Sequence, residues 1–574
     1  MTTAILVLAG IVRYSVPATG EGKVLPDSLP HGAMKDAPCA IVAARGEYEG
    51  GSFVLCADED LGKVDMKVGD LRSEDGDVFL AENLDLTTVK VWYQNSNAWI
   101  SYFQDPELVL CPELLLHDED LVKVDVEKKG NWARIAGKNG RMSYFWLTAP
   151  RGVHKRDVDF RAGRIDDAFH CMQEGFSDAP GFAGATLEKG KNKQFMLTAC
   201  VGKNAKSGLY SGKIDVVSRK SSKLLCEVPI RLRILDFDLP DPKTYYDVGK
   251  DFMSYFCEYV SMEWILSSNG NDVELAKRQL EAILKDFARH NEITPSFGES
   301  VKYKELAERC GMDFKGAFMG QMKLAPDAEA RYAARNTARS LGRIFGSHKG
   351  MLLSWGDEYR MHVLRAIRNM VEIYHEEGFA FAVNSQSGYA GGANIADLWW
   401  PPSYPDRNSA MKVSKYNESA PDGRMGWYAM QHVGVENPAF VRRQYGMGPY
   451  LAGFSCNYNY AHHLQGWNDT EAGLYKPMNF VYGSGNGCID TLAWEGFREA
   501  IDDIRYATLL KTTALKLIAN GNTKARYAAR VALKLLADAK GDDFDLDTFR
   551  LEMIRHIRKL LKFESCLAGK ECKI

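Results

Sequence analysis

The sequence predicts a multidomain chain that joins an all-β N-terminal part to an α/β barrel and a short helical tail. Its 574 residues exceed what one hydrophobic core holds, because single cores stop growing at about 250 to 300 residues. Short apolar runs fill the chain up to about residue 240, strands and helices alternate beyond it, and helices alone follow Thr491. We therefore expect a β-sandwich at residues 1–240, a (β/α)8 TIM-like barrel at 241–515 and a C-terminal helical segment at 516–574.

The N-terminal part has the pattern of an all-β domain. Runs such as CAIVAARG, GSFVLCA, MSYFWLTAP and GLYSGKIDVVS are separated by clusters of Gly, Asp, Asn and Lys. Short strands between such turn residues favour antiparallel sheets, and a sandwich is their simplest packing. The segment LDFDLPDPKT, Leu235 to Thr244, contains two prolines and three aspartates. That composition is typical of a linker and sets the boundary near residue 240.

After the linker the pattern changes to alternating strands and helices. Apolar residues at helical spacing predict helices at DVELAKRQLEAILKDFARHN (Asp272 to Asn291), DAEARYAARNTARSLGRIF and VLRAIRNMVEIYHEEG. The apolar segments ITPSF, GAFMGQM, MLLSW and FAFAVNSQSGY predict strands. This alternation favours a (β/α)8 barrel, because a doubly wound dinucleotide-binding sheet would show GxGxxG after a strand, and no such motif is present.

Composition argues against several classes of protein. Charged residues make up 26% of the chain and the net charge is -3, so we expect no nucleic-acid partner. The leading apolar stretch, Ala4 to Val12, is too short to span a bilayer, and export is left open. The twelve cysteines form no CxxC pair, and we expect mostly free thiols. A basic stripe near the C-terminus is most simply a solvated helix face: Arg555, Arg558, Lys559 and Lys562.

Two adjacent carboxylates, Asp357 and Glu358, follow the predicted strand MLLSW. Active sites of (β/α)8 barrels lie at the C-terminal ends of the strands, which is where this pair would stand. Glycosidic cleavage needs a carboxylic acid to protonate the departing oxygen, and a neighbouring carboxylate raises the pKa of that acid. The pair is therefore our candidate for catalysis. The alternative is ordinary acidic decoration of a helix N-terminus, which the helix dipole favours.

The adjacency of the two carboxylates also constrains the mechanism. Standard glycosidases place their two carboxyls on opposite sides of the scissile bond, about 5 Å or more apart. Sequence neighbours cannot easily straddle a sugar in this way. One of them can instead protonate the leaving group while the other holds a substrate group, the 2-acetamido group of a hexosamine, which itself acts as nucleophile.

Segments rich in aromatic and amide side chains follow the pair, among them FAVNSQSGY, DLWWPPSY and SCNYNYAHHLQGWND. Sugar sites use aromatic faces against C–H surfaces and amides against hydroxyls, although an aromatic-rich core, as for Trp494, is the alternative. The paired His462 and His463 have no HExxH motif and no carboxylate at ligand spacing, so we expect a hydrogen-bonding or core role instead of zinc. Loop position and chemistry give the following candidates for substrate contacts: Trp355, Asn384, Tyr389, Tyr458, Asn459, Tyr460 and Trp467.

With these residues in place, the chain resembles glycoside hydrolase family 123, the β-N-acetylgalactosaminidases, and their relatives. The resemblance spans most of the chain and rests on SGLYSGKIDVVS…VPIRLRILDFDLP, on the Asp-Glu pair and, most specifically, on NYNYAHHLQGWND…VYGSGNGCIDTLAWEGFREAIDDIRYATLL. It implies a retaining, substrate-assisted mechanism with an oxazolinium-like intermediate. Asp357 would orient and polarise the 2-acetamido group, and Glu358 would act as general acid and then as base on water. A carbohydrate is the implied partner, and no cofactor is needed.

Some features depart from the family or leave alternatives open. The family often has proline after the pair, whereas Tyr359 and Arg360 follow here, which leaves the shape of the leaving-group loop open. One alternative is a glycosidase for a sugar without an acetamido group, in which Glu358 is the acid and a distant carboxylate is the nucleophile or base. The candidates for that carboxylate are Glu258, Glu263, Asp397 and Asp469. Another alternative is a non-catalytic carbohydrate-binding protein on a decayed barrel.

Overall fold

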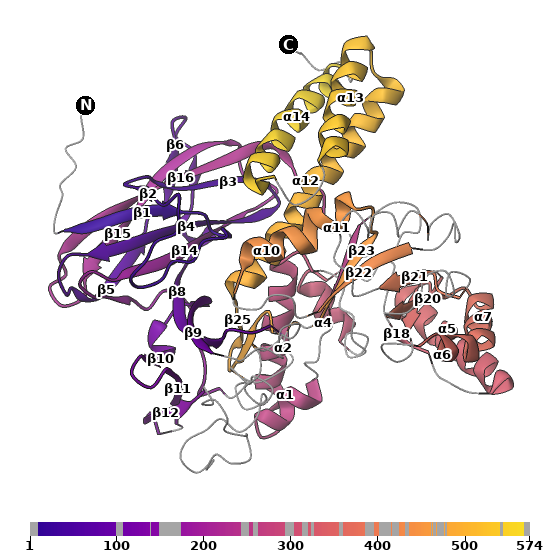
Figure 1. Ribbon diagram of the computed structural model, residues 1–574, viewed down its shortest axis with the longest axis horizontal. Helices are drawn as coiled ribbons and strands as arrows, with labels where there is room; N and C mark the ends of the chain where they lie inside the picture. Colours follow the sequence, from indigo (N-terminus) through magenta and orange to yellow (C-terminus); the bar gives the residue numbers. More distant parts are fainter. Residues whose placement is uncertain are drawn as a thin grey trace.

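The structure is a computed structural model, and it combines several β-sheets with a large helical part (Figure 1). The residues that it describes are 10–98, 107–137, 139–147, 174–242, 252–256, 262–292, 303–312, 320–322, 326–349, 351–354, 360–384, 395–400, 415, 424–430, 436–460, 462, 467, 476, 479–539 and 544–567.

Two mostly antiparallel sheets of the N-terminal part share one apolar core. The first runs in the order β2 (Met34–Lys35), β1 (Ile11–Val16), β4 (Glu47–Ala57), β14 (Asn192–Val201), β8 (Leu84–Asn95) and β9 (Leu108–Leu116). The second runs in the order β13 (Ala185–Leu187), β5 (Gly62–Val68), β15 (Gly208–Ser218), β16 (Leu224–Asp238) and β3 (Cys39–Arg45), with β6 (Leu71–Ser73) and β7 (Val78–Phe79) beside β15. Phe53 and Phe195 of the first sheet pack in the same buried cluster as Ile214 and Ile230 of the second. The period-two burial from Val228 to Ile234 of β16 produces this arrangement, because these apolar side chains fall on one face; Leu235 and Phe237, at the end of the strand, pack in the other large core.

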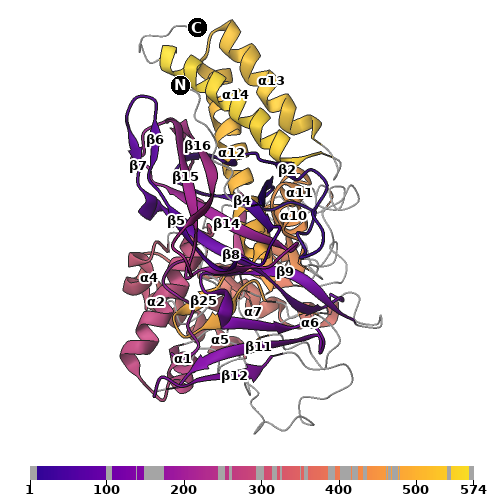
Figure 2. The same cartoon turned by 90° about the vertical axis from the view of Figure 1, so that its left-hand side faces the viewer.

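A third, smaller sheet stands apart from these two. It contains β10 (Val122–Asp125), β11 (Gly130–Ala136) and β12 (Met142–Trp146). The sheet lies on the side of the molecule away from the C-terminal helices (Figures 1 and 2). Its apolar side chains pack with Trp92 of β8 and with Tyr482 near the C-terminal part. The expected single sandwich therefore does not account for every N-terminal strand.

The second half of the chain contains a sheet of seven parallel strands. Their order is β17 (Met253–Phe256), β23 (Cys456–Tyr460), β22 (Arg424–Met430), β21 (Leu398–Trp400), β20 (Ala380–Asn384), β19 (Leu352–Ser354) and β18 (Gly320–Gln321). Within this sheet, β23 comes last along the chain and β17 first, and the two pair in parallel. Sequential neighbours with a last-to-first pairing are the strand order of a barrel.

Helices accompany this sheet, and further helices form the end of the chain. The helices that accompany the sheet are α1 (Met262–Ser268), α2 (Val273–Arg289), α4 (Lys304–Arg309), α5 (Asp327–Phe345), α6 (Met361–Ala366), α7 (Arg368–Glu376), α10 (Pro438–Arg442), the π-helical turn η7 (Arg443–Met447) and α11 (Gly448–Leu451). A hairpin of β24 (Tyr482–Ser484) and β25 (Gly487–Ile489) precedes α12 (Leu492–Asn520), α13 (Thr523–Asp538) and α14 (Leu546–Leu567). The predicted division at residues 515 and 516 falls inside the continuous helix α12.

Local sequence explains where these helices begin and end. Asp272 caps α2 by accepting a hydrogen bond from the amide of Leu275, and Thr491 caps α12 in the same way through the amide of Trp494. Gly346 ends α5 in the left-handed conformation that glycine tolerates best. None of the described helices is both long and apolar enough to cross a membrane.

The structure describes the basic stripe near the C-terminus and most of the cysteines. The four residues of the basic stripe on α14 are all exposed, as a solvated helix face requires. Eight described cysteines are free thiols, whereas Cys566 in α14 is disulfide-bonded.

Candidate active site

The carboxyl edge of the parallel sheet is where a barrel enzyme would hold its active site. β19 ends there at Ser354, and its parallel neighbour β20 ends at Asn384. Asp357 and Glu358 begin three residues beyond Ser354 in the sequence, and they lie outside the described residues together with Trp355. The strand that leads to the pair thus ends at the expected edge, and the role of the pair stays a prediction.

The two faces of the parallel sheet differ in what they pack against. Ala382, Leu398, Trp400 and Tyr428 form one buried cluster on the inner face. Their strand neighbours Phe381, Val383, Trp399 and Trp427 belong to the large core that includes the surrounding helices. Because side chains alternate along a strand, Asn384 lies on the same inner face as Ala382, at the carboxyl end of β20. Asn384 is buried at this end of the sheet, and its contact with a substrate stays a prediction.

Three aromatic rings stack on this inner face near the carboxyl edge. The Tyr458 ring lies 4.7 Å from the Trp400 ring at an interplanar angle of 14°, and 5.2 Å from the Tyr428 ring at 22°. The Trp400 indole Nε1 donates to Sγ of Cys456 at 3.1 Å. Trp400 and Tyr428 are buried, whereas Tyr458 is only half-buried. Tyr458 is thus the partly accessible member of the stack, and its ring is stacked against both of its neighbours.

Gly426 on β22 makes the aromatic stack sterically possible. A Cβ at this position would lie 2.4 Å from Cys456 Sγ and 2.4 Å from Trp400 Cδ1. We expect Gly426→Ala to lower the free energy of unfolding by about 1–3 kcal/mol, because overpacking forces these side chains to shift. Thermal unfolding measures the effect. Gly202→Ala is the control, since no atom lies within 4 Å of its added Cβ; an equal loss in both variants would contradict the steric account.

Asn459 lies on the other face of β23, where it serves the structure. Its Nδ2 donates to Oδ1 of Asn457 at 3.0 Å, and both side chains are fully buried. Asn457 Oδ1 also accepts from Ser254 Oγ at 2.8 Å, and its Nδ2 donates to the Tyr445 carbonyl. The assignment of Asn459 to a sugar-binding loop is therefore corrected: the alternation in NYNY turns the asparagines toward the surrounding helices and Tyr458 toward the inner face.

Trp467 also has a structural environment that differs from the prediction. Its buried indole donates from Nε1 to the Gly483 carbonyl at 2.8 Å. The rings of Phe176, Tyr482 and Trp92 pack around it at 5.0, 4.9 and 5.8 Å. Trp467 thus joins the N-terminal sheets to the β24–β25 region and does not line the inner face of the parallel sheet. The remaining candidates, Tyr389 and the side chain of Tyr460, lie outside the described residues.

The alternative carboxylates occupy different places. Asp397 directly precedes β21 and so stands at the amino edge of the sheet, where it accepts from the Phe381 amide and from His375 Nε2, each at 2.7 Å. That edge is opposite to the one at which Asp357 and Glu358 would act. Glu263 is exposed in the first turn of α1, which follows β17. Glu258 and Asp469 lie outside the described residues.

His462 lies in a buried polar cluster between α2 and α12. Its ring stacks on Phe287 at 4.0 Å, and its Nε2 lies 3.4 Å from Asp286 Oδ2, which also accepts from Trp494 Nε1 at 3.0 Å. Burial alone would raise the pKa of Asp286, but the charge of the neighbouring His290 and contacts with both histidines hold it well below its usual value. Two donor sets here could reach a metal ion: Asp286, His462 and Cys488, and Asp286, His290 and Asp490. His290 already pairs with Asp286 and Glu495, so ion pairing explains why these polar side chains lie together.

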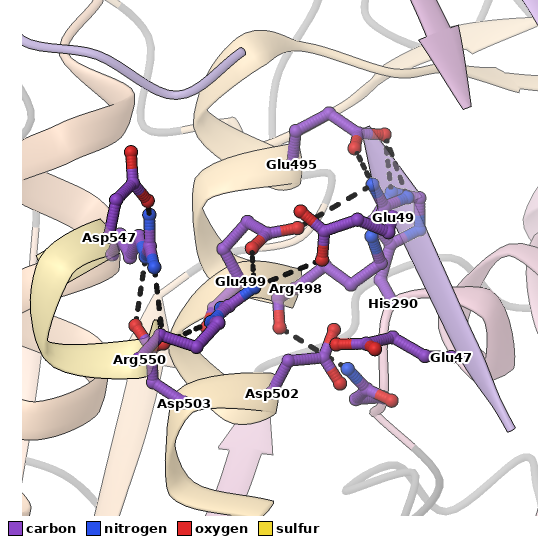
Figure 3. Close-up of polar contacts among 12 residues, drawn as sticks. Glu47, Glu49, His290, Glu495, Arg498, Glu499, Asp502, Asp503, Asp547 and Arg550 are labelled. Atoms are coloured by element: carbon purple, nitrogen blue, oxygen red, sulfur yellow. Dashed lines mark hydrogen bonds and ion pairs between the residues drawn. The ribbon is translucent and has the colours of Figure 1, made fainter. Parts of the chain in front are cut away.

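A second buried cluster, the ionic cluster, joins the N-terminal sheets to the C-terminal helices (Figure 3). Its members are Glu47 and Glu49 of β4, Arg498, Glu499, Asp502 and Asp503 of α12, and Arg550 of α14. Arg550 contacts Asp503 at 2.6 Å, Glu499 at 2.6 Å and Glu49 at 3.0 Å. Sequence reasoning missed this cluster because charged residues on a helix normally face water. It fixes the position of α12 and α14 against the N-terminal sheets.

Glu47 in this cluster makes a pH-dependent contribution to stability. Burial, and next the charge of Asp502, raise its pKa from the usual 4.5 to about 8, although its Oε2 accepts from the Ala44 amide and the Tyr506 hydroxyl. The folded protein therefore holds a proton that the unfolded chain releases above pH 4.5, so stability falls as pH rises toward 8. We expect Glu47→Gln to match the wild type near pH 5 and to exceed its stability by on the order of 2 kcal/mol at pH 8. Unfolding by urea at both pH values measures this; a difference that does not change with pH would contradict it.

Comparisons with known proteins bear on the fold. No protein-family model and no curated protein sequence matches the chain. A solved family 123 glycoside hydrolase from Clostridium perfringens, studied for glycolipid glycan hydrolysis, matches with a TM-score of 0.60 and 12% identity over 92% of this chain and 95% of that chain. β-Glucuronidase 2 of Bacteroides uniformis reaches a TM-score of only 0.27 at 10% identity, over 81% of this chain and 49% of its own, and supports no argument. The chain thus has the fold of a family 123 glycoside hydrolase, and the resemblance predicted from the sequence is confirmed at the level of the fold.

Proposed function

We propose that this protein is a glycoside hydrolase that removes terminal N-acetylated hexosamines, as an exo-β-N-acetylgalactosaminidase does. The observation that carries the proposal is the likeness to a family 123 glycoside hydrolase over 92% of the chain. The aromatic stack on the inner face and the approach of β19 to the carboxyl edge agree with it. In this proposal the parallel sheet closes into a (β/α)8 barrel, and the two large N-terminal sheets form a β-sandwich.

Hydrolysis proceeds in two steps in the proposed mechanism. The carbonyl oxygen of the 2-acetamido group attacks the anomeric carbon, Glu358 protonates the departing oxygen, and Asp357 orients and polarises the acetamido group. The resulting oxazolinium-like intermediate is then opened by water, which Glu358 deprotonates as general base. Two inversions at the anomeric carbon leave its configuration unchanged. Among the described residues, Asn384 at the end of β20 and the half-buried Tyr458 are the proposed contacts of the sugar.

A substrate screen with an inhibitor tests this function. Aryl β-glycosides of N-acetylgalactosamine, N-acetylglucosamine and neutral sugars are compared, and a thiazoline mimic of the intermediate is added. We expect turnover of an N-acetylated glycoside and tight inhibition by the thiazoline, because only an acetamido-assisted site complements that mimic. Turnover of a neutral glycoside without thiazoline inhibition would point to a second, distant carboxylate. Glycan binding without any released reducing ends would identify a non-catalytic carbohydrate-binding protein.

A further inference from the structure

A polar cleft opens between the first N-terminal sheet and the small sheet β10–β12. Its volume is about 610 Å³, and its walls come from β8, β10, β12 and β14. The residues that matter for its chemistry are Lys90, Lys123, Lys193, Glu119 and Tyr144. No residue of the parallel sheet lines the cleft among the residues that the structure describes, so it is separate from the candidate active site.

The charged residues that line the cleft are balanced in number, with four lysines, Lys90, Lys123, Lys191 and Lys193, against four carboxylates, Asp27, Glu119, Asp120 and Glu188, but their pairing is uneven. Lys193 Nζ pairs with Glu119 Oε2 at 2.5 Å, and the other carboxylate oxygen accepts from the Thr186 amide. Lys90 Nζ reaches only the backbone carbonyl of Glu119, at 3.0 Å. The nearby Asp120 is already paired with Lys63 at 2.5 Å. The charges of Glu119, Asp120 and Asp118 act favourably on Lys90, but within the described part of the chain no carboxylate oxygen pairs directly with its ammonium.

Lys90 also has unused hydrogen-bond donors. An ammonium carries three N–H groups, and within the described part of the chain only the bond to the Glu119 carbonyl engages them. Burial lowers the pKa of Lys90 to about 8 against the opposing charge of Glu119, so the group is still mostly protonated at neutral pH. Lys90 is half-buried and lines the cleft, so its spare N–H groups are open to a ligand there. An anionic group in the cleft would accept hydrogen bonds from them and pair with the ammonium directly.

The small sheet contributes an aromatic surface to the cleft. The side chain of Tyr144 on β12 is 46% exposed, and the ammonium of Lys123 lies 6.0 Å from the centre of its ring. An exposed ring inside a polar cleft suits a ligand that has both an apolar face and hydrophilic edges. A pyranose ring has this character, whereas a simple inorganic anion does not.

We propose that this cleft is a second, non-catalytic site that binds an acidic saccharide. Lys90 and Lys193 hold its carboxylate or sulfate group, and its ring lies against Tyr144. The site would retain an acidic glycan on the protein independently of the proposed hydrolysis at the parallel sheet.

Calorimetric titration of the full-length protein tests the proposal. The acidic probes are methyl β-glucuronide and galactose 6-sulfate, their uncharged counterparts are methyl β-glucoside and galactose, and inorganic sulfate represents the anion alone. We expect the acidic sugars to bind and the uncharged ones to bind at least about tenfold more weakly. Lys90→Met and Lys193→Met should each weaken the acidic sugars by about tenfold, whereas the surface control Lys213→Met on β15 should change nothing.

Further measurements separate the components of the site. Tyr144→Ala should weaken the acidic sugars and leave the binding of inorganic sulfate unchanged. Hydrolysis of a small aryl glycoside should be the same in Lys90→Met as in the wild type, so failure of this site and failure of the proposed function are distinguishable. The proposal is overturned if no acidic sugar binds at about 10 mM, if uncharged sugars bind equally well, or if neither lysine variant weakens binding. Sulfate binding as tight as that of the sugars, with no effect of Tyr144→Ala, would show a site for an inorganic anion only.

Discussion

Glu358→Gln is expected to lower kcat for phenyl β-N-acetylgalactosaminide by about 10²- to 10⁴-fold, the range that general acid catalysis supplies. The amide keeps the shape of the side chain but cannot deliver a proton to the departing oxygen. The loss should shrink when phenol is replaced by 4-nitrophenol, a leaving group that needs less protonation. Steady-state kinetics with both substrates measure the difference. Dependence on the leaving group distinguishes a general acid from a residue that merely supports the fold.

Asp357→Asn should behave differently if the two carboxylates have separate roles. Its loss of kcat should be similar for both leaving groups, because the acetamido group that it orients is the nucleophile in either case. Glu372→Gln on α7 is the matched control, since Glu372 is exposed and, within the described part of the chain, its one ion pair is with Arg368, at 3.2 Å. If Glu358→Gln turned over both substrates at the wild-type rate, the assignment of the acid would be wrong. Equal dependence on the leaving group in both variants would contradict the division of roles.

Periodicity within single segments made much of the fold predictable. Apolar residues at helical spacing located α2 and α5, and the strand before Asp357 is present as β19. Asn384, chosen as a loop residue, is the last residue of the predicted strand, β20. These features depend on a few consecutive residues, which the sequence displays directly.

Features that depend on distant partners could not be predicted from local patterns. Trp467 looked like a loop residue near a sugar, yet Phe176 and Trp92, far away in the sequence, enclose it. The strand β12 looked like part of a sandwich, but it pairs with β11 in a separate sheet. Asn459 is the exception, since the alternation in NYNY could have placed it on the outer face.

The buried charges of α12 are the clearest example of a feature that local sequence patterns could not predict. Glu495, Arg498, Glu499, Asp502 and Asp503 are all buried, although a charged helix would normally be assigned to solvent. Arg550 from α14 and Glu49 from β4 complete their environment, and both are remote in the sequence. Only the assembled structure shows that these charges lie at an interface.

Replacing Arg550 by Leu should therefore destabilise the protein by about 3–5 kcal/mol, the cost of removing one partner from a buried ion pair. The change leaves Glu49 and Glu499 without the guanidinium that contacts both, while Arg442 still contacts Asp503 at 2.8 Å. Arg558→Leu on the same helix is the control, because Arg558 is 51% exposed and its pair with Asp236 contributes little.

The pH dependence of the Arg550→Leu defect gives a second, independent measurement. Burial already raises the pKa of Glu49 well above its usual value and also raises that of Glu499, with the charge of Arg550 opposing both shifts. Without Arg550 the two carboxyls should hold their protons to still higher pH, so the folded variant takes up protons that the unfolded chain lacks. The defect should consequently be smaller at pH 5 than at pH 8. Urea unfolding of both variants at the two pH values measures this; a loss equal to that of Arg558→Leu, or one independent of pH, would show that the ionic cluster does not hold α14 against β4.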